Sequence, residues 1–211
     1  MIVTEPVSAY LDSLRPDPDP VLAEMQAHAR RDHIPVVVPA TAGLLEVLAR
    51  AGAHTRALEV GTAIGVSTLA IARGLAPGGT VISFEVDPER HAAARAYLTR
   101  AGVGDRVDLR LQDAREGIGG LQGSFDFIFL DGVKLQYDDY LELVRPRLAP
   151  GGTLVIDNVL QEGAVAGDGG GPQVEAMRAL NRRLVADPEL VATVTPVGDG
   201  VLVAARPVEA G

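Results

Sequence analysis

From Arg56 onward the chain alternates short apolar runs with longer stretches in which apolar residues recur at helical spacing. Strands separated by single helices build parallel sheets with helices on both faces, so this alternation predicts a doubly wound α/β fold. The runs FDFIFLD and TLVID are apolar almost throughout, as expected of central strands covered on both sides. The predicted strands cover 56–60, 80–85, 106–111, 125–131 and 152–157, and the predicted helices cover 66–74, 88–101 and 137–147.

Both ends of the chain depart from this alternation. Residues 1–52 predict a helical segment, whose first helix carries one apolar face made of Val7, Tyr10, Leu11 and Leu14. After the glycine-rich stretch 163–172 and a helix at 173–186, LVATVTP and GVLVAARP predict a closing antiparallel hairpin. We therefore expect residues 1–211 to form one α/β domain, with a mostly parallel sheet and this hairpin at its edge.

Composition excludes several classes of function. The chain has no cysteine, so disulfides, thiolate metal sites and cysteine nucleophiles are ruled out. Its net charge of −9 argues against a nucleic-acid backbone as the main partner. The first residues lack the pattern of a secretory signal, and no apolar run reaches the roughly 20 residues that span a bilayer. We expect a cytoplasmic protein with no membrane partner.

The sequence ALEVGTAIGVSTLAIA (57–72) joins a predicted strand to a helix through a glycine turn. Gly61 and Gly65 let the backbone approach a ligand closely, and Ser67 or Thr68 can donate to that ligand near the helix N-terminus. The spacing is not that of the G-x-G-x-x-G dinucleotide fingerprint. Alone, the turn is also compatible with a purely structural connection between strand and helix.

Two further strand ends extend this candidate cofactor pocket. Glu85 closes the second strand, where a carboxylate can accept hydrogen bonds from the hydroxyls of an adenosine ribose. Asp113 and Ala114 follow the third strand, where the edge of an adenine would lie. Asp87 and Pro88 instead predict the start of the next helix, as its N-cap and its first residue. Because ligands of open α/β sheets bind beyond the carboxyl ends of the strands, these positions should share one edge.

A second polar cluster follows the last two strands of the alternating region. Asp131 ends FDFIFLD with Lys134 three residues on, and Asp157 and Asn158 end GGTLVIDN. Two carboxylates and a carboxamide are oxygen ligands of the kind that hard divalent cations prefer, Mg²⁺ above all. The alternative is structural: Asp131 pairs with Lys134, and Asp157 caps a turn.

The four histidines add no further cluster. His28, His33 and His54 lie in or just after the predicted helical segment, and His91 lies in the helix after the second strand. None has a spacing to another that is typical of metal ligands. We expect surface or capping roles for them.

Seven blocks in order make the chain resemble the metal-dependent O-methyltransferase family that includes catechol O-methyltransferase and the caffeoyl-coenzyme A O-methyltransferases. The resemblance covers residues 34–206 and implies a seven-stranded sheet that ends in an antiparallel hairpin. The blocks are IPVVVPATAGLLEVL, LEVGTAIGVSTLAIA, FEVDPER, FDFIFLDGVK, GGTLVIDNVL, LNRRLVADPEL and PVGDGV.

The resemblance also implies roles for individual residues. Lys134 matches a general base, and the matched metal ligands are Asp131, Asp157 and Asn158, with Asp131 also serving the cofactor pocket and catalysis. The chain departs from the family at Gly132 and Val133, and at Gln161, where plant enzymes have a tryptophan that contacts the acceptor. The positions matched to the S-adenosylmethionine pocket are Val37, Glu59, Gly61, Thr62, Ser67, Glu85 and Ala114.

These observations predict transfer of a methyl group from S-adenosylmethionine to a hydroxyl of a small vicinal diol, assisted by Mg²⁺ and a lysine base. We also expect a homodimer, since the helical segment carries an apolar face that the sheet need not cover. Two alternatives stay open: methylation of a hydroxylated transfer-RNA base, which requires a basic rim, and a non-catalytic S-adenosylmethionine-binding protein. A nicotinamide oxidoreductase fits less well because the glycine spacing is wrong.

Overall fold

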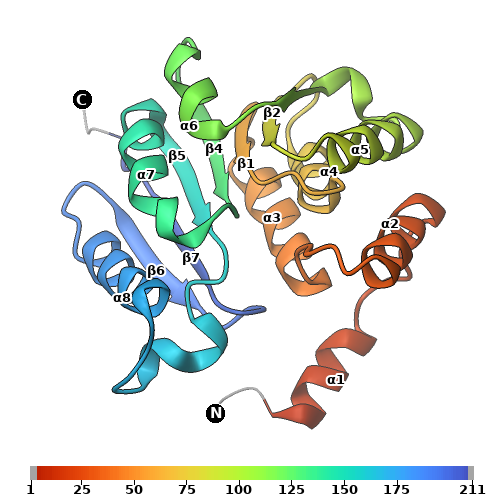
Figure 1. Ribbon diagram of the computed structural model, residues 1–211. Helices are drawn as coiled ribbons and strands as arrows, with labels where there is room; N and C mark the ends of the chain where they lie inside the picture. Colours follow the sequence, from red (N-terminus) through yellow and green to blue (C-terminus); the bar gives the residue numbers. More distant parts are fainter. Residues whose placement is uncertain (1–3, 209–211) are drawn as a thin grey trace.

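The computed structural model describes residues 4–208, and the ends of the predicted domain, 1–3 and 209–211, lie outside the described residues. Its centre is one seven-stranded sheet in the order β3-β2-β1-β4-β5-β7-β6, with helices on both faces (Figure 1). The neighbouring pairs from β3 to β5 are parallel, and β7 is antiparallel to both β5 and β6. The predicted doubly wound sheet with its closing hairpin is confirmed.

The strands follow the apolar runs closely. They are β1 (Arg56–Val60), β2 (Thr80–Glu85), β3 (Val107–Leu111), β4 (Phe125–Leu130), β5 (Leu148–Ile156), β6 (Val191–Thr195) and β7 (Val201–Ala205). The start of β5 was predicted four residues too late, because Pro150, Gly151 and Gly152 look like a turn. In the sheet, Leu148 pairs with Phe125 before the register shifts, so this irregular stretch belongs to the strand.

Side chains of the central strands alternate between two hydrophobic cores. Leu58, Ile128 and Leu154 pack beneath α6 (Ala114–Gly117), α7 (Tyr137–Val144) and α8 (Pro172–Val185) on one face. Ala57, Phe127 and Val155 pack on the other face beneath α2 (Pro20–Arg31), α3 (Pro39–Ala51), α4 (Val66–Gly74) and α5 (Pro88–Arg100). The two groups of helices lie on opposite sides of the sheet in Figure 1. Burial on both faces explains why these strands are apolar nearly throughout.

Proline and aspartate fix where several helices begin. α2, α3, α5 and α8 each have proline at the first helical position, where a missing N–H costs nothing. Asp19 caps α2, and Asp87 caps α5 by accepting from the amides of Glu89 and Arg90 at 2.8 and 3.0 Å. The predicted capping role of Asp87 is confirmed.

The helix α1 (Glu5–Ser13) stands apart from the sheet in Figure 1. None of its residues, all of them within the described range, is buried. Its apolar face is open to solvent, with Tyr10 62% and Leu11 46% exposed. Across residues 4–208, every helix is too short or too polar to cross a lipid bilayer.

His54 corrects one prediction, because it is neither a surface nor a capping residue. Its side chain is buried at the amino-terminal edge of the sheet, and its Nε2 lies 3.0 Å from the Thr153 hydroxyl. Asp126 contacts the same ring and accepts hydrogen bonds from the amides of Thr55 and Arg56, both at 2.8 Å. Burial lowers the pKa of His54, so the imidazole is held neutral as part of the fold.

Candidate active site

A cavity of about 650 Å³ lies at the carboxyl edge of the parallel strands. Its wall includes residues that follow β1 to β5, together with residues 35–38 before α3 and Asp199 in the turn between β6 and β7. The strand order reverses direction between β1 and β4, and the crevice beyond their ends is where open α/β sheets bind ligands. The topology therefore explains why the cavity forms here.

Gly61 lines the cavity where the ends of β1 and β4 pack closely together. It follows β1 with φ +95°, and a Cβ atom on it would lie 2.3 Å from the carbonyl oxygen of Asp131. Gly65, at φ +93°, sits at the N-cap of α4. Their positive φ values favour glycine, so the turn needs glycine at both positions. Whether these residues contact a ligand stays a prediction.

Glu85 closes β2 and lines the cavity, although its side chain is largely buried. Its Oε2 accepts from the amide of Ala63 at 2.7 Å, and its Oε1 accepts from Val86 and Asp87 at 2.8 and 2.9 Å. A carboxylate offers about four lone-pair positions, so about one is left for a ligand hydroxyl. Glu85 thus also holds the β1 turn against the end of β2.

Three other predicted pocket residues also reach the wall. Val37 lines the cavity before α3, and Ala114 lines it at the start of α6. Asp113 lines it as well while capping α6, since it accepts from the Arg115 amide at 2.8 Å. The hydrogen-bonded Arg115 guanidinium holds the pKa of Asp113 below its usual value.

Glu59, Thr62 and Ser67 were predicted to line the same pocket, but their side chains lie beneath its wall and do not form it. The Glu59 carboxyl is fully buried and accepts from the hydroxyls of Ser83 and Thr68. Burial raises the pKa of Glu59 to about 7, although these hydroxyls and that of Ser67 oppose the rise. Their contact with a cofactor stays a prediction.

Asp131 and Asp157 bring two negative charges together beyond β4 and β5. Burial, reinforced by the neighbouring Asp131 carboxylate, raises the pKa of Asp157 to about 6. Burial also raises the pKa of Asp131, against the opposing charge of Lys134. Within residues 4–208, the buried Oδ1 of Asp157 has no hydrogen-bond partner. A buried carboxylate oxygen without a partner is costly, so this pair is incomplete as it stands.

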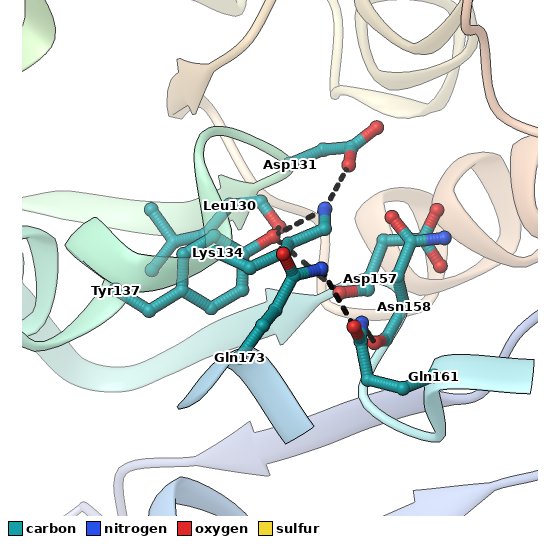
Figure 2. Close-up of polar contacts among 8 residues, drawn as sticks. All are labelled: Leu130, Asp131, Lys134, Tyr137, Asp157, Asn158, Gln161 and Gln173. Atoms are coloured by element: carbon teal, nitrogen blue, oxygen red, sulfur yellow. Dashed lines mark hydrogen bonds and ion pairs between the residues drawn. The ribbon is translucent and has the colours of Figure 1, made fainter. Parts of the chain in front are cut away.

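Asn158 follows in the left-handed region at φ +58°, a conformation that asparagine tolerates better than most residues. Its carbonyl accepts from Nε2 of Gln161 at 2.6 Å, and Oε1 of Gln161 accepts from Gln173 on α8 at 2.7 Å. Figure 2 shows this amide chain from α8 to Asn158. Gln161, the position where plant relatives have tryptophan, therefore fixes the backbone beside the two carboxylates.

Lys134 is the only lysine among the 211 residues, and it lines the cavity. Its Nζ donates to Oδ1 of Asp131 at 2.8 Å and to the hydroxyl of Tyr137 at 2.8 Å (Figure 2). The structural alternative for Asp131, pairing with Lys134, is therefore present in the structure. Burial raises the pKa of Tyr137 well above its usual value, so its hydroxyl keeps its proton.

The turn between β6 and β7 supplies Asp199, for which the sequence suggested no role. Because β7 is antiparallel, its first residue lies at the same edge as the last residues of β4 and β5. The Asp199 carboxylate accepts from the amide of Glu162 at 2.5 Å, and its carbonyl accepts from Leu160 at 3.0 Å. The available signal was the GDG sequence of the turn, already part of the PVGDGV block.

The residues beyond β4 and β5 fit a hard divalent cation. Asp131 and Asp157 provide carboxylate oxygens, one of them without a partner, and Asn158 provides an amide. In the part of the chain that the structure describes, no three His, Cys, Asp or Glu side chains form a metal-binding group. A cation held here would therefore take its remaining ligands from water or from an acceptor.

Comparison with known proteins gives a consistent result. The family model described as O-methyltransferase matches residues 14–207. A probable caffeoyl-CoA O-methyltransferase of Dictyostelium discoideum is 32% identical over 69% of this chain and 66% of its own length. A catechol O-methyltransferase of Mycobacterium tuberculosis is 34% identical over 89% of this chain and 86% of its own length.

Solved structures agree with this. An O-methyltransferase from Bacillus cereus in complex with SAH is 29% identical, with a TM-score of 0.86 over 95% of this chain and 97% of that one. The family model spans nearly the whole described chain, and the fold matches from the first sheet-facing helices to the closing hairpin. The chain therefore belongs to the O-methyltransferase family of enzymes.

Proposed function

We propose that this chain transfers a methyl group from S-adenosylmethionine to one hydroxyl of a small vicinal diol, with Mg²⁺ held by Asp131, Asp157 and Asn158. The observation that carries the proposal is the unpartnered Oδ1 of Asp157, buried beside a second carboxylate in the same cavity as Glu85. A cation completes this pair, whereas a pocket for the cofactor alone has no need of it. The catechol and caffeoyl-CoA relatives support an acceptor with adjacent oxygens.

The cofactor would occupy the part of the cavity formed by the ends of β1, β2 and β3. Gly61 lines this part of the cavity without a side chain, and Glu85 retains about one free lone-pair position for a ribose hydroxyl. The relative from Bacillus cereus binds SAH, the product left when S-adenosylmethionine loses its methyl group, which supports this cofactor. Glu59, Thr62 and Ser67 would support the same region from beneath.

The acceptor must lose a proton to attack the sulfonium methyl group at neutral pH. A bound divalent cation would supply positive charge that lowers the pKa of a hydroxyl beside it. Lys134 would accept the proton once it has itself released one to solvent and is a neutral amine; its amine lines the cavity next to Asp131. Its present ion pair with Asp131 must loosen for this role, and neutralisation of Asp131 by a cation would favour that change.

A methyl-transfer screen tests the proposed function. The acceptors would be catechols, free hydroxycinnamates, caffeoyl-CoA, aliphatic vicinal diols and undermodified transfer RNA, each with Mg²⁺ and with excess chelator. We expect turnover of at least one aromatic vicinal diol that chelator abolishes and Mg²⁺ restores. Equal turnover in chelator would contradict the metal mechanism, and turnover of transfer RNA alone would contradict the acceptor class.

We also propose a homodimer that covers the apolar face of α1. Val7, Tyr10, Leu11 and Leu14 are all exposed on this helix, and a second copy of the chain is the simplest partner that would bury them. Sedimentation at micromolar concentration should give a dimer, and Tyr10→Ser with Leu14→Ser should shift it to a monomer. A wild-type protein that sediments as a single 22.0 kDa species would contradict the proposal.

A further inference from the structure

We propose that the hydroxyl of Tyr137 is a positioning group for Lys134, which holds the amine beside Asp131 and so sets how often the base is correctly placed. This inference rests on the proposed function, because it gives a partner to the base of that reaction. It concerns a residue that does not itself line the cavity but contacts Lys134, which does.

The local structure places Tyr137 directly below the lysine. Lys134 begins the short 3-10 helix η3 (Lys134–Gln136), and Tyr137 is the first residue of α7. The tyrosine ring is 1% exposed and lies in the core beneath α7. Its hydroxyl accepts from Nζ of Lys134 at 2.8 Å (Figure 2), and the same Nζ lies 5.1 Å from the centre of the ring.

The tyrosine hydroxyl also lies near two backbone carbonyls. Its oxygen is 3.4 Å from the carbonyl oxygen of Leu130 and 3.4 Å from that of Asp157, both long for an O–H···O hydrogen bond. The single O–H can donate toward either carbonyl while an oxygen lone pair accepts from the amine of Lys134. One buried hydroxyl thus connects the two strands that carry the proposed metal ligands to the proposed base.

Without the hydrogen bond to Tyr137, the side chain of Lys134 can adopt several other conformations. This side chain rotates about four bonds, so holding the amine in one place costs conformational entropy. Asp131 alone restrains the amine at a single point, Oδ1, and a cation would compete for that carboxylate. Tyr137 keeps a second contact that does not depend on Asp131. Lys134 would therefore stay at the wall of the cavity when its ion pair loosens.

Tyr137→Phe tests the proposal because it removes one oxygen and keeps the buried ring. We expect kcat for the acceptor to fall about tenfold to a hundredfold, as misplaced catalytic groups do, with little change in KM or in cofactor affinity. The matched control is Tyr97→Phe on α5, which removes a buried hydroxyl that contacts His28 at 3.0 Å, outside the cavity. The control should leave kcat unchanged within about twofold.

A double-mutant cycle separates positioning from general damage to the fold. If Tyr137 acts through Lys134, Tyr137→Phe should change kcat by less than about twofold in a Lys134→Ala background. Effects that multiply in the double variant would mean that Tyr137 acts independently of the lysine, and the proposal would be wrong.

The single lysine allows a test that needs no turnover. With lysine labelled by nitrogen-15, the full-length protein should give one side-chain ammonium signal, detectable because its hydrogen bonds slow exchange with water. Tyr137→Phe should shift this signal or broaden it beyond detection, while Tyr97→Phe should leave it in place. An unchanged signal in Tyr137→Phe, or none in the wild type, would overturn the positioning role.

The lysine signal also allows the Tyr137 contact to be tested separately from the proposed methyl transfer. A protein that methylates no vicinal diol but shows the expected change in the lysine signal would contradict the proposed function and keep the Tyr137 contact. If Tyr137→Phe fails to fold, 3-fluorotyrosine at that position keeps the ring and the hydroxyl and alters its acidity. The Lys134 signal must then shift if the hydrogen bond exists, and no shift would refute it.

Discussion

The carboxylates in the two halves of the cavity, the first beyond β2 and β3 and the second beyond β4 and β5, differ in how many hydrogen-bond partners they have. Beyond β2 and β3, Glu85 and Asp113 are held by backbone amides, and Asp113 also by the Arg115 guanidinium. Beyond β4 and β5, Asp131 pairs with Lys134, and Oδ1 of Asp157 has no partner within residues 4–208.

The backbone differs in degree. In the turn after β1, Gly61 and Gly65 have positive φ, and Ala63 is the one non-glycine residue of that turn that does, at φ +47°. Beyond β5, three non-glycine residues adopt the left-handed region, namely Asn158, Gln161 and Glu162. Such conformations cost free energy and persist where surrounding contacts impose them, often at functional sites. The carboxylates that line the first half have protein partners, although Oε1 of Glu59 beneath them has none within residues 4–208. The carboxylates that line the second half carry unfavourable charge that a bound cation would relieve.

The largest expected effect comes from removing one carboxylate of the incomplete half. Asp157→Ala should abolish Mg²⁺-dependent methyl transfer, because it leaves one carboxylate to hold the cation. Cofactor affinity, measured by titration calorimetry, should stay nearly unchanged because the proposed cofactor contacts lie beyond other strands. The matched control is Asp108→Ala, an exposed aspartate on β3 outside the cavity, which should retain full turnover. Full Mg²⁺-dependent activity in Asp157→Ala would show that the carboxylates beyond β4 and β5 are not needed to hold the cation.

Glu59 sharpens the comparison, since it is a buried carboxyl beneath the satisfied half. Its pKa in the folded chain is about 7, against 4.5 for an ordinary glutamate, with burial the largest cause. Below pH 4.5 both states carry the proton; between 4.5 and about 7 only the folded state keeps it. The free energy of unfolding should therefore fall as pH rises through this window, by about 3 kcal/mol in total.

Denaturant unfolding at several pH values measures this slope. Glu59→Gln keeps the size and hydrogen-bonding capacity of the side chain without the titration, so this part of the pH dependence should disappear. Glu116→Gln, an exposed glutamate on α6, is the control and should keep the wild-type slope. An unchanged slope in Glu59→Gln would mean that other groups cause it.

Glu85 tests whether a satisfied carboxylate still binds the cofactor. Glu85→Ala should weaken S-adenosylmethionine binding by roughly 1.5–3 kcal/mol, the usual value of a hydrogen bond to a charged group. Asp87→Ala is the matched control from the same turn: it removes the cap of α5 and should cost about 1 kcal/mol of stability with no loss of cofactor affinity. Equal losses of affinity in both variants would show that Glu85 only shapes the turn.

The smallest effect is expected at Gln161, where a substitution should change Mg²⁺ affinity more than it changes stability. Gln161→Gly removes the hydrogen bond to Asn158 and also the strain of a non-glycine residue at φ +49°. Stability should therefore change by less than about 1 kcal/mol, because the two contributions oppose each other. Mg²⁺ affinity, read by calorimetry, should fall by up to about tenfold as Asn158 loses its restraint. Unchanged Mg²⁺ affinity would show that Gln161 does not contribute to the metal site.

The parts of the molecule that the sequence predicted share one property: they depend on local pattern and chain order. Apolar runs marked the strands, and parallel strands place their carboxyl ends together, which brings Gly61, Glu85 and Asp157 to one edge. Asp87 and Pro88 were recognisable because a cap and the first residue of a helix are adjacent in the chain.

The parts that were missed depend on contacts between distant residues or on a partner for a single atom. His54 reaches Thr153, 99 residues away, so its burial left no trace in the helical pattern around it. Gln173 supports Gln161 from another helix, and Tyr137 was one more apolar position at helical spacing. That Glu59 lies beneath the wall follows from which face of β1 it occupies, and both faces of that strand are buried.

The closing hairpin has a consequence for how the protein is made. Residues 35–38 and Asp199 meet across the same cavity, so its wall joins segments from near the two ends of the chain. A ribosome delivers these segments in order, at about 5–20 residues per second, and the early helices can pack before the late turn exists. A growing chain that has not yet released Asp199 therefore lacks one wall of its site. Catalytic competence would appear only after most of the sheet has formed.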